Sequence, residues 1–395
     1  MARAPHQAAP ARAGRASILR LSTAAADDRA AVQEILRQCP GGVPGFAMIF
    51  CSTSHDLASI GAALKAAGCT RVVGAATGRA IGAQGFLPQG LTGFHLPARR
   101  FQVADTVIED AAKFGLPDAR DFVRALRGRL ERNGGAQLPH LFGLLLVDAE
   151  ARCEEKLIAA IGTQLGGVPI VGGSAGDLYF NPFGHPPGST RILHHGRALR
   201  GAAVLCLVAS ESPVIAVSHN HFSAGTRRVV ITDADPEKRL VREINGRKAL
   251  TEYAAACGLR RRAKCTQDFA PYPLMIRVGG QFFPRGVQRC YDDGTLEFAC
   301  AMEPGIVATV ARPGDYVARL RDMFEGMRAA IGPPELVIAF ECSARTAYME
   351  QHGLTSDVEG LYRDNGVVGF STLGEQFNTV HVNNSLTCLG IGAAR

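Results

Sequence analysis

Two stretches decide the fold, LVIAFECS (336–343) and VVGFSTLGE (367–375), which are separated by a segment with helical spacing. The first is a continuous apolar run, as expected for a strand in a sheet whose face is covered by helices. The same order of apolar strand, helix and Val-x-Gly-like turn occurs twice earlier. The strands are FAMIFCS from Phe46 and LFGLLLVD from Leu141, and the turns are VVGAATG from Val72 and IVGGSAG from Ile170. The sequence therefore predicts an α/β fold with a repeated β-α-β unit.

The three units are expected to share further features. Each should hold one helix, over 56–68, 150–165 and 347–364, and each should be followed by one more strand: GLTGFHL from Gly90, GAAVLCLV from Gly201 and NTVHVNNSLTCLGIG from Asn378. Glycines in the turns permit positive φ or a close backbone approach. We expect these Gly-rich turns to gather near one cleft.

A different region lies between the second and third units, over residues 212–330. It has short alternating strands, and Gly279-Gly280 between two of them is a hairpin signal. The helix KALTEYAAACGL is expected to end on Gly258 as its C-cap. This region is predicted to be α+β and mostly antiparallel. The predicted divisions are a disordered tail (1–17), an N-terminal domain (18–210) and a C-terminal domain (211–395).

Composition excludes several classes of protein. The chain is 47% hydrophobic and 20% charged, which is typical of a globular protein. Its net charge of +7 is spread along the chain, and no basic stripe with a groove-entering motif predicts a nucleic-acid partner. No apolar run is long enough for membrane insertion. The first 17 residues lack the apolar part of a signal peptide, and the 11 cysteines are irregularly spaced, so we expect reduced thiols and a cytoplasmic location.

Several motifs together resemble the bacterial FIST family of sensory modules. The FIST N half is similar in VVGAATG, GLTGFHLPA, VPIVGGSAGD and GRALRGAAVLCLV, and the FIST C half in REINGRKALTEYA, LVIAFECSAR, VVGFSTLGEQ and HVNNSLTCLGIG. The resemblance covers residues 40–395. It implies a protein that binds a small ligand and signals to a partner, and not an enzyme.

The chain shows no kinase, cyclase or methyl-accepting output segment. It therefore most resembles the stand-alone FIST sensors of the NosP group, which bind haem and sense nitric oxide. That resemblance implies non-covalent haem b, nitric oxide as ligand, and a separate sensor histidine kinase in a two-component system. Two alternatives stay open: a FIST sensor of another small ligand such as an amino acid, and a Cys-dependent enzyme.

His381 is the first candidate for a metal ligand, because a non-covalent haem needs an axial ligand. In TVHVNNSLTC the polar residues occupy one face of a predicted strand, where Asn383 and hydroxyl groups flank His381 and can fix its tautomer. A general ligand-site or structural role for His381 is the alternative. His221, which shares a strand face with His219, is the second candidate for the iron ligand; the alternative is a satisfied or exposed pair near a strand end.

Three more candidates come from the third unit. Cys342 ends a strand just before a helix, where the helix dipole can lower the pKa of its thiol. Arg345 is suited to pair with a carboxylate or a propionate, and Glu375 follows the Gly374 turn. An enzyme would use Cys342 as nucleophile and His381 as base.

Overall fold

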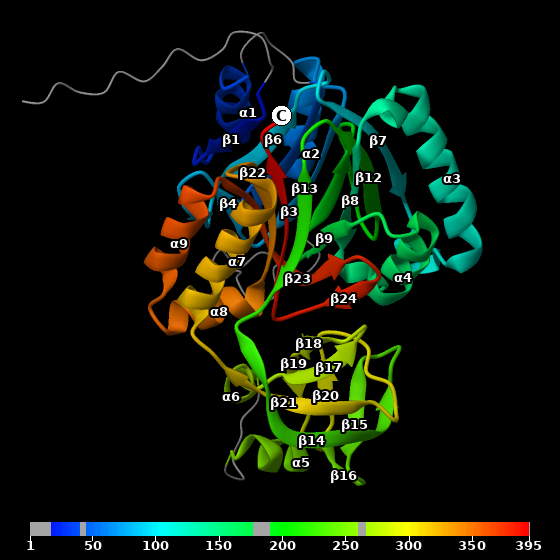
Figure 1. The fold of residues 1–395 in the computed structure, drawn as a ribbon, viewed down its shortest axis with the longest axis vertical. Coiled ribbons are helices and arrows are strands. Elements are labelled where there is room, and N and C mark those ends of the chain that lie inside the picture. The colour runs from blue at the N-terminus through cyan, green and yellow to red at the C-terminus, as the bar shows by residue number, and fades with distance from the viewer. Residues whose placement is uncertain (1–16, 40–44, 177–189, 260–265, 395) are drawn as a thin grey trace, which may run out of the picture.

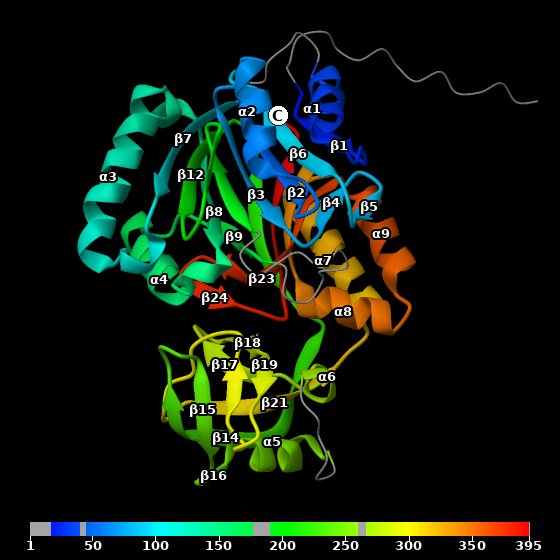
Figure 2. The ribbon, with the colours of Figure 1, turned by 180° about the vertical axis from the view of Figure 1, so that it is seen from behind.

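A computed structural model describes residues 17–39, 45–176, 190–259 and 266–394. Except for Ser17, the predicted tail over 1–17 lies outside the described residues. The chain forms a larger body of sheets and helices and a smaller, mainly β body beside it (Figure 1 and, from behind, Figure 2).

One sheet of the larger body has six strands and comes from the first half of the chain. Two helices, α1 (Asp28–Arg37) and α2 (Leu57–Ala66), cover its outer face. Its strands, in spatial order, are β1 (Leu19–Thr23), β6 (Leu91–Leu96), β2 (Phe46–Ser52), β3 (Val72–Thr77), β10 (Arg191–His194) and β11 (Arg197–Leu199).

The second sheet has eleven strands, which come from both halves of the chain. Its main order is β13 (Val214–His219), β25 (Leu386–Gly392), β22 (Pro334–Cys342), β23 (Val367–Phe377), β9 (Ile170–Ala175), β8 (His140–Asp148), β12 (Ala203–Ser210) and β7 (Phe101–Ile108). Three short strands extend it: β4 (Ala80–Gly82), β5 (Gly85–Leu87) and β24 (Val380–Val382).

Helices cover the outer face of the second sheet in two groups. One group packs over β7, β8 and β12, and the other over β22 and β25. The groups are α3 (Leu116–Arg132) with α4 (Glu154–Leu165), and α7 (Tyr316–Ile331) with α8 (Ser343–Gln351) and α9 (Thr355–Asp364). Short 3-10 turns are η1 (Ala111–Lys113), η2 (Gly135–Gln137) and η3 (Ala149–Ala151).

The inner faces of the two sheets pack against each other. Phe50 of the first sheet lies 5.0 Å from Phe370 of the second, measured between ring centroids, and Phe340 lies 5.4 Å from Phe370. These rings belong to one buried apolar cluster that draws residues from both sheets. The larger body is therefore layered helix, sheet, sheet, helix, and the α/β prediction is confirmed.

The three predicted β-α-β units are present, each with a parallel strand pair: β2 with β3, β8 with β9, and β22 with β23. In each unit, one glycine of the second strand is paired with a residue of the first strand and leaves no room for a side chain. An added Cβ would meet the carbonyl oxygen of the paired residue at 2.2 Å at Gly74, 2.0 Å at Gly172 and 1.7 Å at Gly369. Close approach of the backbones, and not a turn, explains these glycines.

Three details of the prediction are wrong. The Gly-rich motifs lie inside strands β3, β9 and β23 and are not turns. The helix predicted over 347–364 is two helices, α8 and α9, because the chain turns at Gly353, whose φ is 68°. The final strand is also two strands, β24 and β25, separated by Asn383 and Asn384, with Asn384 at φ 51°.

The smaller body lies within the predicted antiparallel region, but β13 and α7, which the prediction placed in that region, belong to the larger body. Its eight-stranded sheet encloses an apolar core with helix α5 (Ala249–Cys257), beside the short α6 (Thr266–Phe269). Gly279 and Gly280 form the predicted hairpin, with φ of 56° and 85°. The strands are β14 (Phe222–Asp235), β15 (Leu240–Ile244), β16 (Arg247–Lys248), β17 (Leu274–Val278), β18 (Gln281–Arg285), β19 (Val287–Cys290), β20 (Leu296–Phe298) and β21 (Val307–Pro313).

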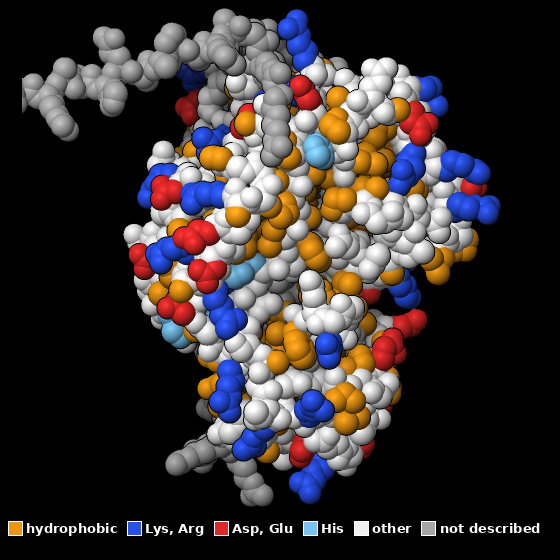
Figure 3. Space-filling model, in the orientation of Figure 1, with side chains coloured by type: hydrophobic (Ala, Val, Ile, Leu, Met, Phe, Trp, Pro, Cys, Tyr) orange, Lys and Arg blue, Asp and Glu red, His pale blue; other side chains and the backbone are white. Residues whose placement is uncertain are grey.

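Two strands carry the chain between the bodies. Strand β13 pairs with β25 in the larger body and continues into β14 of the smaller body, and β21 returns the chain to α7. Strand β13 is an edge strand and is half-exposed along its length. Figure 3 shows hydrophobic side chains gathered in the middle of this face, with charged groups of both signs toward its sides.

Two sequence expectations concern the whole chain. Within the described ranges, none of the helices has the length and apolar character needed to span a bilayer. Nine described cysteines are free thiols, as expected, but Cys290 is disulfide-bonded, so the expectation of reduced thiols is wrong there.

The glycine contacts give a first prediction. Replacing Gly369 with Ala should destabilise the protein by several kcal/mol, because the new Cβ would overlap the Ala339 carbonyl oxygen and the strands would have to separate. Gly326→Ala is the matched control, since it lies within helix α7 with open space around it and should gain up to about 1 kcal/mol. Urea unfolding of both variants measures the difference, and equal stability would contradict the close-approach explanation.

Candidate functional site

The second strands of the three units come together where β3 and β9 end, beside the middle of β23. The hydroxyl of Thr77 donates to the carbonyl oxygen of Ser371 at 2.5 Å, and the amide of Gly78 donates to that of Gly176 at 3.2 Å. The three Gly-containing motifs therefore meet, although they come from two sheets, whereas the cleft expected beside them stays a prediction.

A buried ion pair lies at the end of β22. The guanidinium of Arg345 donates from Nε to the carboxylate of Glu341 at 2.7 Å, and neither residue is more than 1% exposed. The hydroxyls of Tyr316 and Tyr362 donate to the same carboxylate, and the guanidinium carbon lies 4.3 Å from the Tyr316 ring centre. Arg345 therefore has an internal carboxylate partner.

His221 joins this cluster from the strand connection between the bodies. Its Nδ1 accepts a hydrogen bond from Nη1 of Arg345 at 3.3 Å, and its ring packs between Tyr316 and Tyr348. Burial and the charge of Arg345 lower the pKa of His221 to about 2, and similarly that of His219 to about 3. Both imidazoles are therefore neutral at pH 7.

Glu375 and Cys342 form a second buried group. The Glu375 carboxyl accepts hydrogen bonds from the hydroxyls of Thr372 and Ser385, and the thiol of Cys342 contacts the same carboxyl group. Burial raises the pKa of Glu375 to about 8, so it is mostly protonated at pH 7. Burial also raises the pKa of the Cys342 thiol well above its ordinary value, and the amide of Asn384 donates to its sulfur at 3.2 Å. A neutral, buried thiol is a poor nucleophile.

His381 lies elsewhere, where β24 faces the smaller body. Its ring packs on Gly374, where an added Cβ would lie 2.3 Å from the ring atom Cε1. The side chain is buried, and burial lowers its pKa, although Glu155 and Glu154 oppose that shift. Neither ring nitrogen has a hydrogen-bond partner among the described residues. His381 is therefore a neutral imidazole with free nitrogens.

Polar contacts hold the two bodies together around His381. The amide of Gly286 in the smaller body donates to Oδ1 of Asn383 at 2.8 Å. Arg239, also of the smaller body, donates to the carboxylates of Glu154 and Glu155 at 2.5 and 2.8 Å at the start of α4. We call this region, formed by β24, the start of α4, Arg239 and residues 285–301, the junction.

The junction also holds buried polar atoms without partners. Besides the His381 nitrogens, Nε of Arg285 has no hydrogen-bond partner within the described part of the chain, whereas the Asn383 side chain contacts the Cys300 thiol. Leaving such a group unpaired costs about 1–3 kcal/mol. Buried polar atoms without partners in a native protein call for an explanation, and a bound ligand is one.

The sequence did not point to Arg285, Arg239 or Glu155. They come from three separate segments, and each looks like an ordinary surface charge in its own stretch. Only the packing of the smaller body against α4 and β24 brings them to His381. Of the predicted residues, Arg345 meets His221 and Cys342 meets Glu375, whereas His381 and Asn383 lie at the junction.

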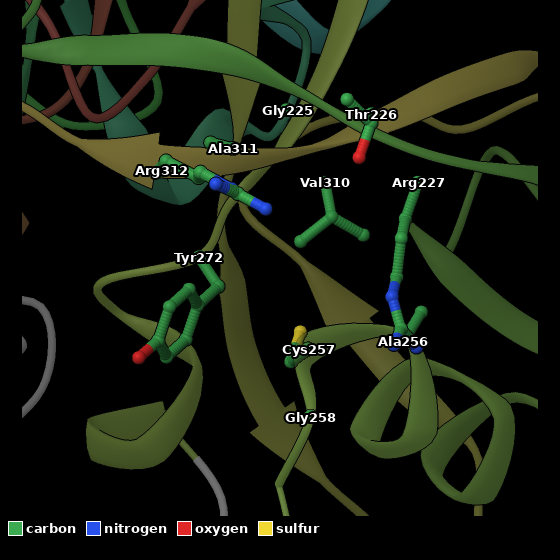
Figure 4. Close-up of a pocket in the computed structure, with 10 residues that line it drawn as sticks. All are labelled: Gly225, Thr226, Arg227, Ala256, Cys257, Gly258, Tyr272, Val310, Ala311 and Arg312. Carbon is green, nitrogen blue, oxygen red and sulfur yellow. The ribbon is translucent and has the colours of Figure 1, made fainter.

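The smaller body has a separate cleft of about 210 Å³. A β-bulge parts β14 from β21 between Ala224 and Arg228, and Figure 4 shows Arg227, Arg312, Tyr272 and Cys257 around the resulting space. Burial raises the pKa of the Cys257 thiol to about 12. None of the predicted site residues lines this cleft.

A haem site needs an axial ligand and an apolar slot. His381 is a suitable donor because its nitrogens are free. The described groups that act on it, however, are the charged side chains of Glu154, Glu155, Arg239 and Arg285, and its ring is in contact with Gly374. The described residues thus provide a ligand for haem iron that lies among charged side chains.

The buried ion pair gives a second prediction. Arg345→Met should lower the free energy of unfolding by about 3–5 kcal/mol, because the Glu341 carboxylate would stay buried without its cation. The double variant Glu341→Gln/Arg345→Met removes both charges and should lose less. Urea unfolding measures both, and an Arg345→Met variant as stable as wild type would show that the pair does not hold the fold.

A third prediction follows from Glu375. Its folded pKa of about 8 lies above the ordinary 4.5, so the folded protein holds more protons than the unfolded chain between these pH values and loses stability as pH rises through them. The slope should approach about 1.4 kcal/mol per pH unit. Glu375→Gln should lack this contribution, so its stability relative to wild type should grow from about pH 5 to about pH 8 and then level off. A difference that is constant with pH would contradict the raised pKa.

Two protein-family models match the chain, one over each half. The model of the FIST N domain matches residues 45–247, and the model of the FIST C domain matches residues 249–378. A comparison with curated proteins finds no match. The two domains together cover most of the described chain, and FIST domains are in general sensor domains for small ligands. The chain belongs to the FIST family.

Proposed function

We propose that this protein is a small-ligand sensor whose ligand binds at the junction, between β24 and the smaller body. The observation that carries the proposal is the set of buried nitrogens on His381 and Arg285 that have no partner among the described residues. A ligand with acceptor atoms would satisfy them and recover the free energy that their burial costs.

The chemistry of these groups favours a compact, polar ligand with an anionic end. Arg285 and the Asn383 amide are donors, and the neutral imidazole of His381 offers one donor and one acceptor. An amino acid or another small carboxylate has this pattern of charge and hydrogen bonding. The charged side chains that act on His381 favour such a polar ligand over a large hydrophobic one.

Haem is the second candidate, and its support is the free, neutral imidazole of His381. A haem-bound protein would be the nitric oxide sensor that the resemblance to the NosP group implies. The polar surroundings of His381 place it second.

A ligand at the junction would touch both bodies, which two chain crossings connect. Such a ligand stabilises the arrangement of bodies that it bridges, and a partner that binds one arrangement better reads this as a signal. We propose a separate sensor histidine kinase as that partner. Its autophosphorylation should differ between the free and the ligand-bound protein.

The fourth prediction uses the cost of the unpaired groups. His381→Leu should raise the melting temperature of the free protein, because it removes a buried imidazole without partners, and should abolish the shift caused by a ligand. The measurement is a thermal-shift screen of the free amino acids and small carboxylates, together with an absorption spectrum after adding haem.

His55→Leu is the matched control. His55 is also buried and its Nε2 is likewise without a partner among the described residues, but its Nδ1 is paired with Asp28 at 2.7 Å, so its loss should lower the melting temperature and leave the ligand shift in place. A ligand shift that survives in His381→Leu would place the site elsewhere. A Soret band that depends on His381, without any shift by the small carboxylates, would favour haem over the compact ligand.

A further inference from the structure

A cluster of two histidines and one aspartate lies on the opposite side of the fold from the β13 edge of the large sheet. Nε2 of His194 and Nε2 of His195 lie 2.9 and 2.7 Å from the same carboxylate oxygen, Oδ2 of Asp105. The two imidazoles lie against each other with centroids 4.0 Å apart. One ligand atom from each residue is within 4.8 Å of the other two.

The cluster joins the edges of the two sheets. Asp105 lies on β7, the last strand of the eleven-stranded sheet, and His194 ends β10, next to the last strand of the six-stranded sheet. Strand β10 and strand β11 form a hairpin whose two-residue turn is His195-Gly196. These three side chains therefore connect the two sheets of the larger body.

The turn holds His195 in an unusual conformation. Its φ is 51° and that of Gly196 is 85°, which is the turn in which Asn-Gly is strongly preferred. A non-Gly residue at positive φ is uncommon, although histidine is among the residues enriched there, and strained positions of this kind cluster at functional sites. At residue 195 this conformation turns a second imidazole toward the carboxylate already reached by His194.

We propose that Asp105, His194 and His195 form a binding site for a divalent transition-metal ion, with zinc as the reference ion. Two imidazole nitrogens and one carboxylate oxygen are a donor set typical of zinc sites that keep a fourth position open. The Asp105 side chain is 5% exposed, whereas His195 is 32% exposed, so the open position faces solvent on the histidine side. The ion ties β7 to the β10–β11 hairpin.

The neighbouring Arg71 does not occupy the donor atoms of this site. The guanidinium of Arg71 lies 3.9 Å from the other carboxylate oxygen, Oδ1, and donates to the carbonyl oxygen of Val103 at 2.7 Å. Oδ2 remains directed at the two imidazoles. Although burial raises it, the hydrogen bonds from the histidines hold the pKa of Asp105 well below its ordinary value, so the carboxylate is ionised.

The fifth prediction tests this site on the full chain after EDTA treatment. Equilibrium dialysis with zinc should load about one ion per chain, and zinc should raise the melting temperature of the wild type. His195→Asn should weaken zinc binding by at least about 10-fold, the loss that follows even from removing an outer-shell partner of a metal ligand. Asparagine is favoured in this turn, so the hairpin should fold normally.

His140→Asn is the matched control, because His140 begins β8 outside the cluster and should leave zinc binding unchanged. Replacing zinc with cobalt adds a spectroscopic readout that distinguishes nitrogen and oxygen ligands from cysteine thiolates. The proposal is overturned if the wild type binds no stoichiometric zinc, if His195→Asn binds it as tightly as wild type, or if the cobalt spectrum shows thiolate ligation.

Discussion

The close approach of paired strands at three glycines is the constraint on which the rest of the structure depends. Gly74, Gly172 and Gly369 each leave no space for a Cβ beside the carbonyl oxygen of the neighbouring parallel strand. Strands held this close set the register of all three β-α-β units. The register brings the ends of β3 and β9 beside the middle of β23, and the extension of β23 carries β24 to the smaller body.

The polar interior then divides into parts with different roles. Glu341 accepts hydrogen bonds from Arg345 and two tyrosines, which holds α7, α8 and α9 against the sheet, although Nη2 of Arg345 has no partner among the described residues. At the junction the contacts between the bodies are satisfied, while both ring nitrogens of His381 and Nε of Arg285 have no partner among the described residues. We propose that the first arrangement serves stability and the second serves ligand binding.

The sequence predicted the parts of the fold that depend on local pattern. Apolar runs and repeated glycines identified the three units, and Gly279-Gly280 identified the hairpin. It did not show that β23 continues through Gly374, because strand pairing with β9 and β24, and not local preference, extends it. His381 and Asn383 could be chosen from the sequence, but Arg285 could not, since only the docking of the smaller body places it at the junction.

The central claim is that a ligand binds between the two bodies, and hydrogen–deuterium exchange tests it most directly. The protein is compared with and without the compound that gives the largest thermal shift. We predict slower exchange in the ligand-bound protein at both Val380–Val382 of the larger body and Gln281–Arg285 of the smaller body, because the ligand would contact both. Protection confined to the cleft at residues 225–227, or to one body alone, would contradict it.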